Sequence, residues 1–248
     1  LMRVNATLNN SKGELRIYDF LISALQEEGK NVLKLRSDFA DAEVRGKYTF
    51  EAVPATVKRA LADLYPSRFS SAVKEEKVPE ADFTLSATIR KLDKLNDFLG
   101  TGLSIADGSR INGSLNSVRS EISIAMRSGA ITYAGTTLSS MNLSGSAGGG
   151  LMSVTLEADT VLLPDKSVLG NFVAEAGSHT DTLDLGMRWD NRDGGRTFGE
   201  VSARGFFSLN TMNRAFLAVS LLPTAFTVDR VPWSVSPARI VIEIGRAS

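Results

Sequence analysis

The single histidine, His179, is the residue best suited to acid–base chemistry, because imidazole titrates near neutral pH. It lies in Gly177-Ser178-His179-Thr180-Asp181, a composition typical of a turn. A catalytic triad needs a histidine that is oriented by a carboxylate and placed beside a nucleophile. Asp181 is close in sequence, but no serine lies in a strand-to-helix nucleophile motif. We therefore interpret His179 as a solvated turn residue and expect no catalytic residue and no enzymatic activity.

A glycine-rich stretch, Gly145-Ser146-Ala147-Gly148-Gly149-Gly150, resembles a phosphate-binding loop superficially. Such a loop needs a following helix whose amide groups meet the phosphate, and a P-loop adds a lysine. Here a strand pattern follows and no lysine is near. The stretch therefore predicts a hairpin turn, and no nucleotide cofactor is expected.

Acidic residues gather around Trp189, where Asp190, Asp193 and Glu200 could form the carboxylate pair of a glycoside hydrolase. The run Asp190-Asn191-Arg192-Asp193-Gly194-Gly195 is equally typical of a solvated hairpin loop, and we favour that interpretation. The chain has no cysteine, which excludes disulfides and thiolate metal ligands. No calcium-loop spacing is present, so no metal site is expected.

The composition limits the partners and the size of the core. Lysine plus arginine and aspartate plus glutamate number 28 each, so the net charge of zero gives no reason to propose nucleic acid. The 248 residues are 43% hydrophobic, enough for one large or two small β domains. No apolar run approaches the length of a membrane span, and no signal peptide is evident. Because both ends read like strands, we interpret the chain as a fragment of a longer protein.

Strict alternation of apolar and polar residues is the strongest structural signal. It recurs in at least three segments and places the apolar side chains of each strand on one face of a sheet. We predict that these apolar positions share one concave face and form a lipid groove: Ile122, Ile124, Met126, Met152, Val154, Leu156, Leu183, Leu185 and Met187.

Turn signals divide the rest of the chain into short strands. We expect strands over residues 3–8, 14–25, 32–36, 41–51 and 83–90, a helix over about 54–65, and a second short helix over 92–99. Residues 66–81 read as an exposed loop. Further turns are expected at Ser128-Gly129, Gly177-Ser178 and six other places, and Leu209 to Leu222 fits a helix or a strand.

The apolar stripes admit two interpretations. One is the buried core of a β-sandwich or barrel. The other is an open, curved sheet whose apolar face binds acyl chains. The low aromatic content of 7% and the aliphatic and methionine side chains favour the open sheet, since little bulk is available to fill a core.

Several segments resemble the TamB translocation and assembly module family, whose members are AsmA-like, bridge-like lipid-transfer proteins. The resemblance lies in the segment from Ser37 to Tyr48, in the helix ending at Tyr65-Pro66-Ser67, in the glycine-punctuated strands, and in the ending from Leu222-Pro223 through Trp233 to Ile242. It implies a taco-like sheet with an apolar groove in the periplasm of a double-membrane bacterium, with the full-length protein anchored in the inner membrane. It also implies phospholipid transport, a role in outer-membrane protein assembly, and an outer-membrane barrel partner of the TamA or BamA type.

The resulting hypothesis is a mainly β protein with a long curved antiparallel sheet and one or two short helices. Residues 1–81 form strands, a short helix and a loop, and residues 82–248 continue the same groove with repetitive strands. Its ligands would be phospholipid acyl chains, because each methylene exposed to water costs about 0.8 kcal/mol. A β-sandwich adhesion or carbohydrate-binding module is the alternative. A parallel β-helix enzyme is disfavoured, since hairpin signals imply antiparallel pairing.

Overall fold

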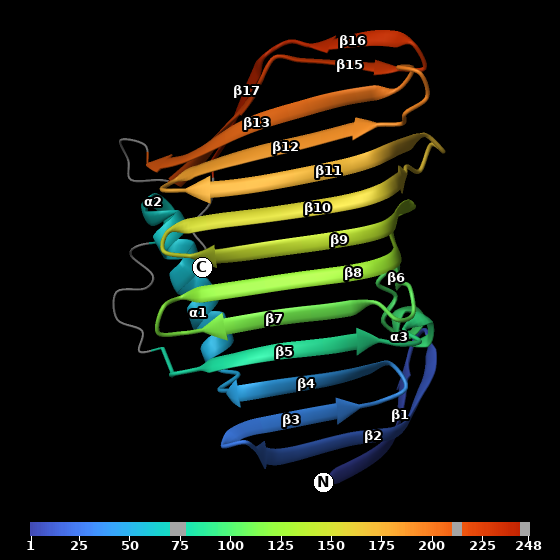
Figure 1. Cartoon of the computed structure of the whole chain (residues 1–248), viewed down its shortest axis with the longest axis vertical. Helices are drawn as coiled ribbons and strands as arrows, with labels where there is room; N and C mark the ends of the chain where they lie inside the picture. Colours follow the sequence, from blue (N-terminus) through green and yellow to red (C-terminus); the bar gives the residue numbers. More distant parts are fainter. Residues whose placement is uncertain (70–77, 210–214, 244–248) are drawn as a thin grey trace.

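In the computed structural model, which describes residues 1–69, 78–209 and 215–243, every strand belongs to one 17-stranded antiparallel sheet (Figure 1). The strands are β1 (Met2–Asn10), β2 (Gly13–Glu27), β3 (Lys30–Arg36), β4 (Ala40–Lys47), β5 (Asp82–Ile89), β6 (Leu103–Ile105), β7 (Arg110–Asn116), β8 (Glu121–Tyr133), β9 (Thr136–Gly148), β10 (Leu151–Leu162), β11 (Val168–His179), β12 (Thr182–Asp190), β13 (Phe198–Leu209), β14 (Ala215–Leu221), β15 (Thr224–Val228), β16 (Val231–Val235) and β17 (Ala238–Glu243).

The strands follow one another as a meander, in which each strand pairs with its neighbour in sequence from β1 to β5 and from β7 to β14. β5 pairs with β7, while the short β6 pairs with the far half of β8. At the other end, β15 pairs with the start of β13, and β17 pairs with β14. The described pairings do not join β1 to β16 or β17, so the sheet is curved but not closed (Figure 1). The expected long antiparallel sheet is confirmed.

The cross-strand register turns the alternation in sequence into one apolar face. Directly paired residues lie on the same side of a sheet. One row of such pairs crosses thirteen strands without a single polar side chain: Ala24, Leu33, Val44, Leu85, Gly113, Ile124, Gly145, Val154, Ala176, Leu185, Ala203, Leu221 and Ala238. At about 4.8 Å between strands, the row is about 58 Å long. We call the side that carries it the apolar face.

The ladders of β8 to β11 are interrupted at one common level. Gly129, Ser140, Asp159 and Asn171 lie opposite one another but form no bridge pairs. Ser140 and Asn171 have positive φ values of 52° and 47°. Interruptions of this kind bend strands and increase their twist. The bend therefore runs as a line across four neighbouring strands, parallel to the apolar row.

In the described part of the chain, three short helices accompany the sheet: α1 (Ala52–Leu64), α2 (Pro66–Phe69) and α3 (Asp93–Leu99). Figure 1 shows α1 crossing the left-hand ends of the central strands, so that its axis runs across the strand direction. α3 ends at Gly100, whose φ of 64° is the left-handed conformation that glycine adopts at helix C-termini. The expected helices over 54–65 and 92–99 are thereby confirmed.

The main buried cluster forms where the start of α1 meets the sheet. Ala52 packs with Val44, Ala81, Phe83 and Leu115, and partly buried Leu33, Leu85 and Ile122 surround them. Because Leu33, Val44 and Leu85 belong to the apolar row, α1 must lie on the apolar face. Its buried positions are mostly alanines, which allow the helix backbone to approach the sheet closely. The helix thus covers one margin of the face.

Two turn predictions were wrong. Ser128-Gly129 lies inside β8, where the glycine marks the bend and not a reversal of the chain. Gly177-Ser178 lies inside β11, and the reversal occurs at Thr180 and Asp181, with φ values of 30° and 61°. The glycine-rich turn is confirmed, since Gly149 and Gly150 have the positive φ values of a two-residue hairpin.

The ambiguous segment and the expected loop are resolved only in part. Residues 215–221 of the segment from Leu209 to Leu222 form a strand, β14, while 210–214 lie outside the described residues. The expected loop over 66–81 begins with the four-residue helix α2, and its residues 70–77 lie outside the described residues.

Gly46 tests the close approach of β4 to β5. Its φ is 126°, and a Cβ atom would lie 2.3 Å from the backbone oxygen of Asp82. We expect Gly46→Ala to lower the free energy of unfolding by about 2 kcal/mol or more, because the clash is with backbone and the φ is strained. The matched control is Gly186→Ala in β12, where a Cβ atom meets nothing within 4 Å. Urea denaturation measures both variants, and equal stabilities would contradict the prediction.

Candidate functional site: the apolar face

The structure brings the nine apolar residues singled out in the sequence onto one face. Ile124, Val154 and Leu185 belong to the thirteen-residue row already described. A second row contains Ile122, Met152 and Leu183, and a third contains Met126, Leu156 and Met187. The three segments come from β8, β10 and β12, which are separated in the sheet by β9 and β11. Their common side is a fact of the register, whereas lipid binding by them is a proposal.

The intervening strands contribute residues that the sequence reasoning missed. On the apolar face, β9 places Gly145 and Ala147, and β11 places Ala174 and Ala176. In the first two rows, large side chains on β8, β10 and β12 therefore alternate with small ones on β9 and β11, whereas in the third row β9 places the large Leu143 between Met126 and Leu156. A Cβ atom at Gly145 would lie 3.3 Å from Ile124 Cγ2 and 3.4 Å from Val154 Cγ2, so these side chains close over the glycine. The small residues follow the same alternation and could have been identified by their phase.

Much of this face is open to solvent. Ile124 is 47% exposed, Leu185 is 42% exposed and Met187 is 43% exposed, although all three lie in the middle of the sheet. Ile122, close to α1, is by contrast partly buried and packs against the buried cluster. Large aliphatic side chains that are exposed in the middle of one face, with partly exposed apolar residues between them, are typical of binding surfaces.

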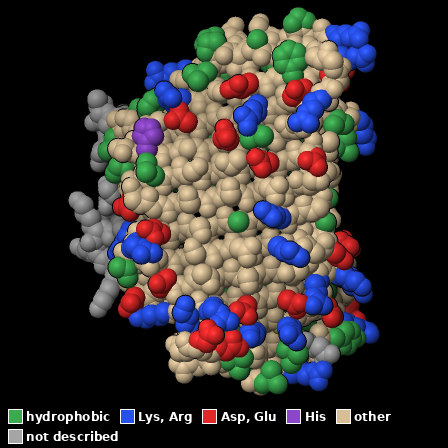
Figure 2. Space-filling view, in the orientation of Figure 1, with side chains coloured by type: hydrophobic (Ala, Val, Ile, Leu, Met, Phe, Trp, Pro, Cys, Tyr) green, Lys and Arg blue, Asp and Glu red, His purple; other side chains and the backbone are tan. Residues whose placement is uncertain are grey.

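The opposite face is polar. The row displaced by one residue from the apolar row contains only two residues without a polar side chain, Ala125 and Gly186. The other members are Ser23, Lys34, Glu43, Ser86, Asn112, Ser144, Thr155, Glu175 and Ser202. Figure 2 shows this side with scattered charges and few hydrophobic side chains over the central strands. The sheet is thus amphipathic over most of its length, as one-sided burial or binding requires.

Asp181 fastens the end of α1 to the sheet. Its carboxylate accepts hydrogen bonds from the backbone N–H of Ser67 at 3.0 Å and from Ser67 Oγ at 2.7 Å. Its backbone N–H donates to the carbonyl of Leu64 at 2.7 Å, and its carbonyl accepts from the N–H of Phe207 at 2.8 Å. Tyr65 and Phe207 pack beside it with ring centroids 4.5 Å apart. The β11–β12 turn therefore holds α1 along one side of the apolar face.

The aspartates considered for catalysis accept hydrogen bonds that stabilise turns and loops. His179 is exposed at the end of β11, and the nearby Asp181 carboxylate is bonded to Ser67. Asp190 accepts a hydrogen bond from the N–H of Arg192 at 2.8 Å, within the loop that joins β12 to β13. Asp193 accepts from the N–H groups of Arg196 and Thr197 in the same loop. Desolvation is the largest single influence on the pKa of Asp193 and raises it. The hydrogen bonds together outweigh desolvation, so the pKa lies below its usual value.

Trp189, the aromatic residue of that acidic group, lies on the apolar side and is 8% exposed. Its ring meets Phe226 at 5.7 Å between centroids, and Phe226 in turn stacks on Trp233 at 6.4 Å. Gly199 makes room for the indole, since a Cβ atom there would lie 2.6 Å from a ring carbon of Trp189. The indole N–H finds no hydrogen-bond partner among the described residues. The aromatic row extends the apolar surface towards β16.

A cavity of about 1280 Å³ opens at the strand ends away from α1, between the β1–β2 turn and α3. Its charged lining mixes signs, with Lys12, Arg16 and Arg90 beside Asp38 and Asp97. Asn10 and Lys12 bridge the gap by donating to the carbonyls of Phe98 and Leu99. Such a lining suits a solvated mouth and does not select one ligand charge.

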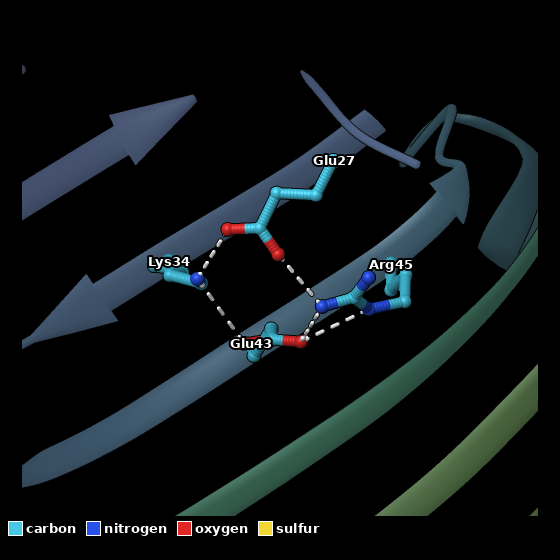
Figure 3. A network of polar contacts seen from close by, with 4 residues as sticks. All are labelled: Glu27, Lys34, Glu43 and Arg45. Atoms are coloured by element: carbon cyan, nitrogen blue, oxygen red, sulfur yellow. Dashed lines mark hydrogen bonds and ion pairs between the residues drawn. The ribbon is translucent and has the colours of Figure 1, made fainter. Parts of the chain in front are cut away.

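The polar face carries a four-residue ionic network on β2 to β4 (Figure 3). Glu27 accepts hydrogen bonds from Lys34 at 2.7 Å and from Arg45 at 2.9 Å, and Arg45 also donates to Glu43 at 3.1 Å. The bond from Lys34 is the main cause that holds the pKa of Glu27 below its usual value. Val32, which pairs directly with Arg45 on this face, is fully buried. The network therefore links the side chains of three neighbouring strands, β2, β3 and β4.

No family model, curated protein or solved structure matches the chain. Within residues 1–69, 78–209 and 215–243, no helix is long and apolar enough to cross a membrane. In the same described ranges, no three His, Asp or Glu side chains form a group that could hold a metal ion.

Asp181→Gly tests the attachment of α1. Glycine keeps the positive φ of 61° and removes only the carboxylate, so we expect a loss of about 1–2 kcal/mol in unfolding free energy. Hydrogen exchange should increase in residues 60–69. The matched control is Asp229→Gly, which has a φ of 47° in the β15–β16 turn and a side chain that makes no hydrogen bond to the described residues. Equal stability losses in the two variants would contradict a role for the carboxylate.

Glu27→Gln tests the ionic network through pH. The folded-state pKa of Glu27 lies below the usual 4.5, so its stabilisation is present above that value and is lost as pH falls through the folded-state pKa. We expect the variant to melt below the parent at pH 7 and the difference to disappear in acid. The control is Glu28→Gln in the adjacent turn. A melting difference that stays constant from pH 7 to acid would contradict the ionic explanation.

Proposed function

We propose that this chain is a lipid-binding segment of an inter-membrane phospholipid bridge of the TamB type and that it has no catalytic activity. The observation that carries the proposal is the thirteen-residue row without a polar side chain, which runs across the strands on a face that is partly open. An acyl chain lying along such a row would exchange its contact with water for contact with aliphatic side chains. Each methylene removed from water contributes about 0.8 kcal/mol.

The direction of the row supports transport as well as storage. A closed pocket holds one ligand, whereas a track that crosses successive strands offers equivalent sites in sequence. The row is about 58 Å long at the usual strand spacing, which exceeds the length of a single acyl chain several-fold. Lipids could therefore move from strand to strand without leaving an apolar surface. Aliphatic and methionine side chains suit such movement, because they make adaptable contacts.

The margins of the face support the same proposal. α1 covers one side of the apolar row, and Asp181 and Tyr65 hold it there. On the other side the strands of β8 to β11 bend at a common level. A phospholipid could place its acyl chains between these margins while its headgroup stays in solvent. The polar outer face fits an aqueous compartment, for which we propose the periplasm of a double-membrane bacterium.

The remaining parts of the proposal come from the resemblance to the TamB family. They are an inner-membrane anchor for the full-length protein, an outer-membrane barrel partner of the TamA or BamA type, and a role in outer-membrane protein assembly. The competing β-sandwich module requires two sheets that face each other, whereas the described strands form one sheet. We therefore keep the lipid track as the single proposed function.

A carboxylate placed on the track tests the function. We expect Leu185→Asp and Leu156→Asp to lower the bound phospholipid at least several-fold. The unfolding free energy of Leu185→Asp should fall by less than the several kcal/mol of a closed core, because Leu185 is 42% exposed and water can solvate the new charge. The measurement combines thermal melting with mass spectrometry of lipid extracted from detergent-free protein.

Ser153→Asp is the matched control, because Ser153 is the neighbour of Val154 on the polar face of β10. It should retain the lipid content of the parent. The proposal fails if the parent binds no phospholipid from vesicles of phosphatidylethanolamine and phosphatidylglycerol, or if all three variants bind as the parent does.

A further inference from the structure

Charged residues that face each other across the described ladders have opposite signs, with one exception. The direct pairs of opposite sign are Glu27 with Lys30, Lys34 with Glu43, Arg36 with Asp41, Lys47 with Asp82, Asp184 with Arg204, and Arg188 with Glu200. The exception is Arg110 of β7, which lies directly opposite Arg127 of β8. Because like charges in this position destabilise a ladder, the pair suggests that a counter-charge is supplied from outside the sheet.

The two arginines are exposed on the polar face, since their neighbours Ile111 and Met126 pair on the apolar face. The guanidinium groups of Arg110 and Arg127 make no ion pair and no hydrogen bond to other residues in the described ranges. Arg45, on the same face, is by contrast ion-paired with two carboxylates. The positive charges of Arg110 and Arg127 are therefore available to a ligand.

Neutral hydrogen-bonding residues flank the arginine pair along the row. Thr88 of β5 lies directly opposite Arg110, and Asn142 of β9 lies directly opposite Arg127. On either side the next acidic residue of the row is two strands away, which is about 10 Å at the usual strand spacing. No carboxylate therefore lies directly opposite either guanidinium in its ladder.

A cavity of about 320 Å³ opens beside the pair, at the level where β8 and β9 bend. Arg110, Arg127 and Asn142 line this cavity together with Gly129 and Ser140, the two residues that form no bridge pair at the bend. The hollow is as large as the smaller ligand sites of proteins. It allows a small anion to meet both guanidinium groups and the amide at once.

We propose that Arg110, Arg127 and Asn142 bind a phosphate group on the polar face of the sheet. Each guanidinium can donate two parallel hydrogen bonds, so two of them on adjacent strands can reach different oxygens of one tetrahedral anion. A phosphate monoester carries a charge of about −1.5 to −2 at neutral pH, which balances both arginines, whereas a carboxylate balances only one. The Asn142 amide can donate to a further oxygen. The site lies on the face opposite the apolar row and does not depend on lipid binding there.

Arg127→Gln tests the site, because it removes one charge and keeps a side chain that can donate a hydrogen bond. In phosphate-free buffer of low ionic strength, the variant should melt at or above the temperature of the parent, since the repulsion is gone. Sodium phosphate should raise the melting temperature of the parent more than sodium chloride of the same ionic strength does. The variant should show no such excess, and titration calorimetry should give it at least tenfold weaker binding of inorganic phosphate.

Arg188→Gln is the matched control, because Arg188 lies farther along the same row but faces Glu200. It should bind phosphate as the parent does. Arg127→Glu should stabilise the phosphate-free protein through an opposite-charge pair with Arg110 and should bind no phosphate. The proposal is overturned if phosphate stabilises the parent no more than chloride does, or if Arg188→Gln weakens phosphate binding as much as Arg127→Gln does.

Two further probes identify the source of the phosphate group: glycerol 3-phosphate, and phosphatidylcholine vesicles that contain phosphatidic acid, whose headgroup is a phosphate monoester. Binding of inorganic phosphate and glycerol 3-phosphate without vesicle binding assigns the site to a soluble ligand. Vesicle binding that is lost in Arg127→Gln and kept in Leu185→Asp assigns it to a lipid headgroup. Because Leu185→Asp alters only the apolar face, failure of the phosphate site and failure of the lipid track give different results.

Discussion

The constraint on which the whole structure depends is the register between neighbouring strands. A shift of one residue would move every side chain of a strand to the opposite face. Here thirteen strands keep one phase, so that Ile124, Val154 and Leu185 fall on the same row although they are far apart in sequence. Short hairpin turns join many of these strands, whereas α1 and α2 lie between β4 and β5, and α3 and β6 lie between β5 and β7. The apolar face is therefore a property of the entire meander and not of any one strand.

The same apolar face has a buried part near α1, which stabilises the fold, and an exposed part in the middle of the sheet. Near α1 the apolar side chains are buried with Ala52 and Phe83, and they form a conventional core. In the middle of the sheet Ile124 and Leu185 belong to the same row but remain exposed. Exposed aliphatic area on this scale opposes solubility unless something covers it. A lipid acyl chain satisfies that requirement without fixing a single binding position, which is why the proposal of a track fits the arrangement better than a specific pocket does.

Alternation in the sequence predicted the sheet and the common face of the apolar residues of β8, β10 and β12. A period of two places all the apolar side chains of one strand on the same face. Alternation did not reveal that β9 and β11 contribute Gly145 and Ala176, because small residues give a weak hydrophobic signal. The reversal at Thr180 and Asp181 was misplaced to Gly177-Ser178, because glycine and serine suit turns locally. Contacts with Leu64, Ser67 and Phe207, which are distant in sequence, accompany the actual turn. The network around Glu27 likewise depends on pairings that spacing alone does not specify.

The central claim is that acyl chains lie on the apolar face, and site-specific photo-crosslinking in living cells tests it most directly. A photoreactive residue at Ile124 and one at its neighbour Ser123 lie on opposite faces of the same strand. The account predicts phospholipid adducts at position 124 and none at position 123. Equal labelling at both positions, or no lipid adduct at position 124 in folded protein, would contradict it.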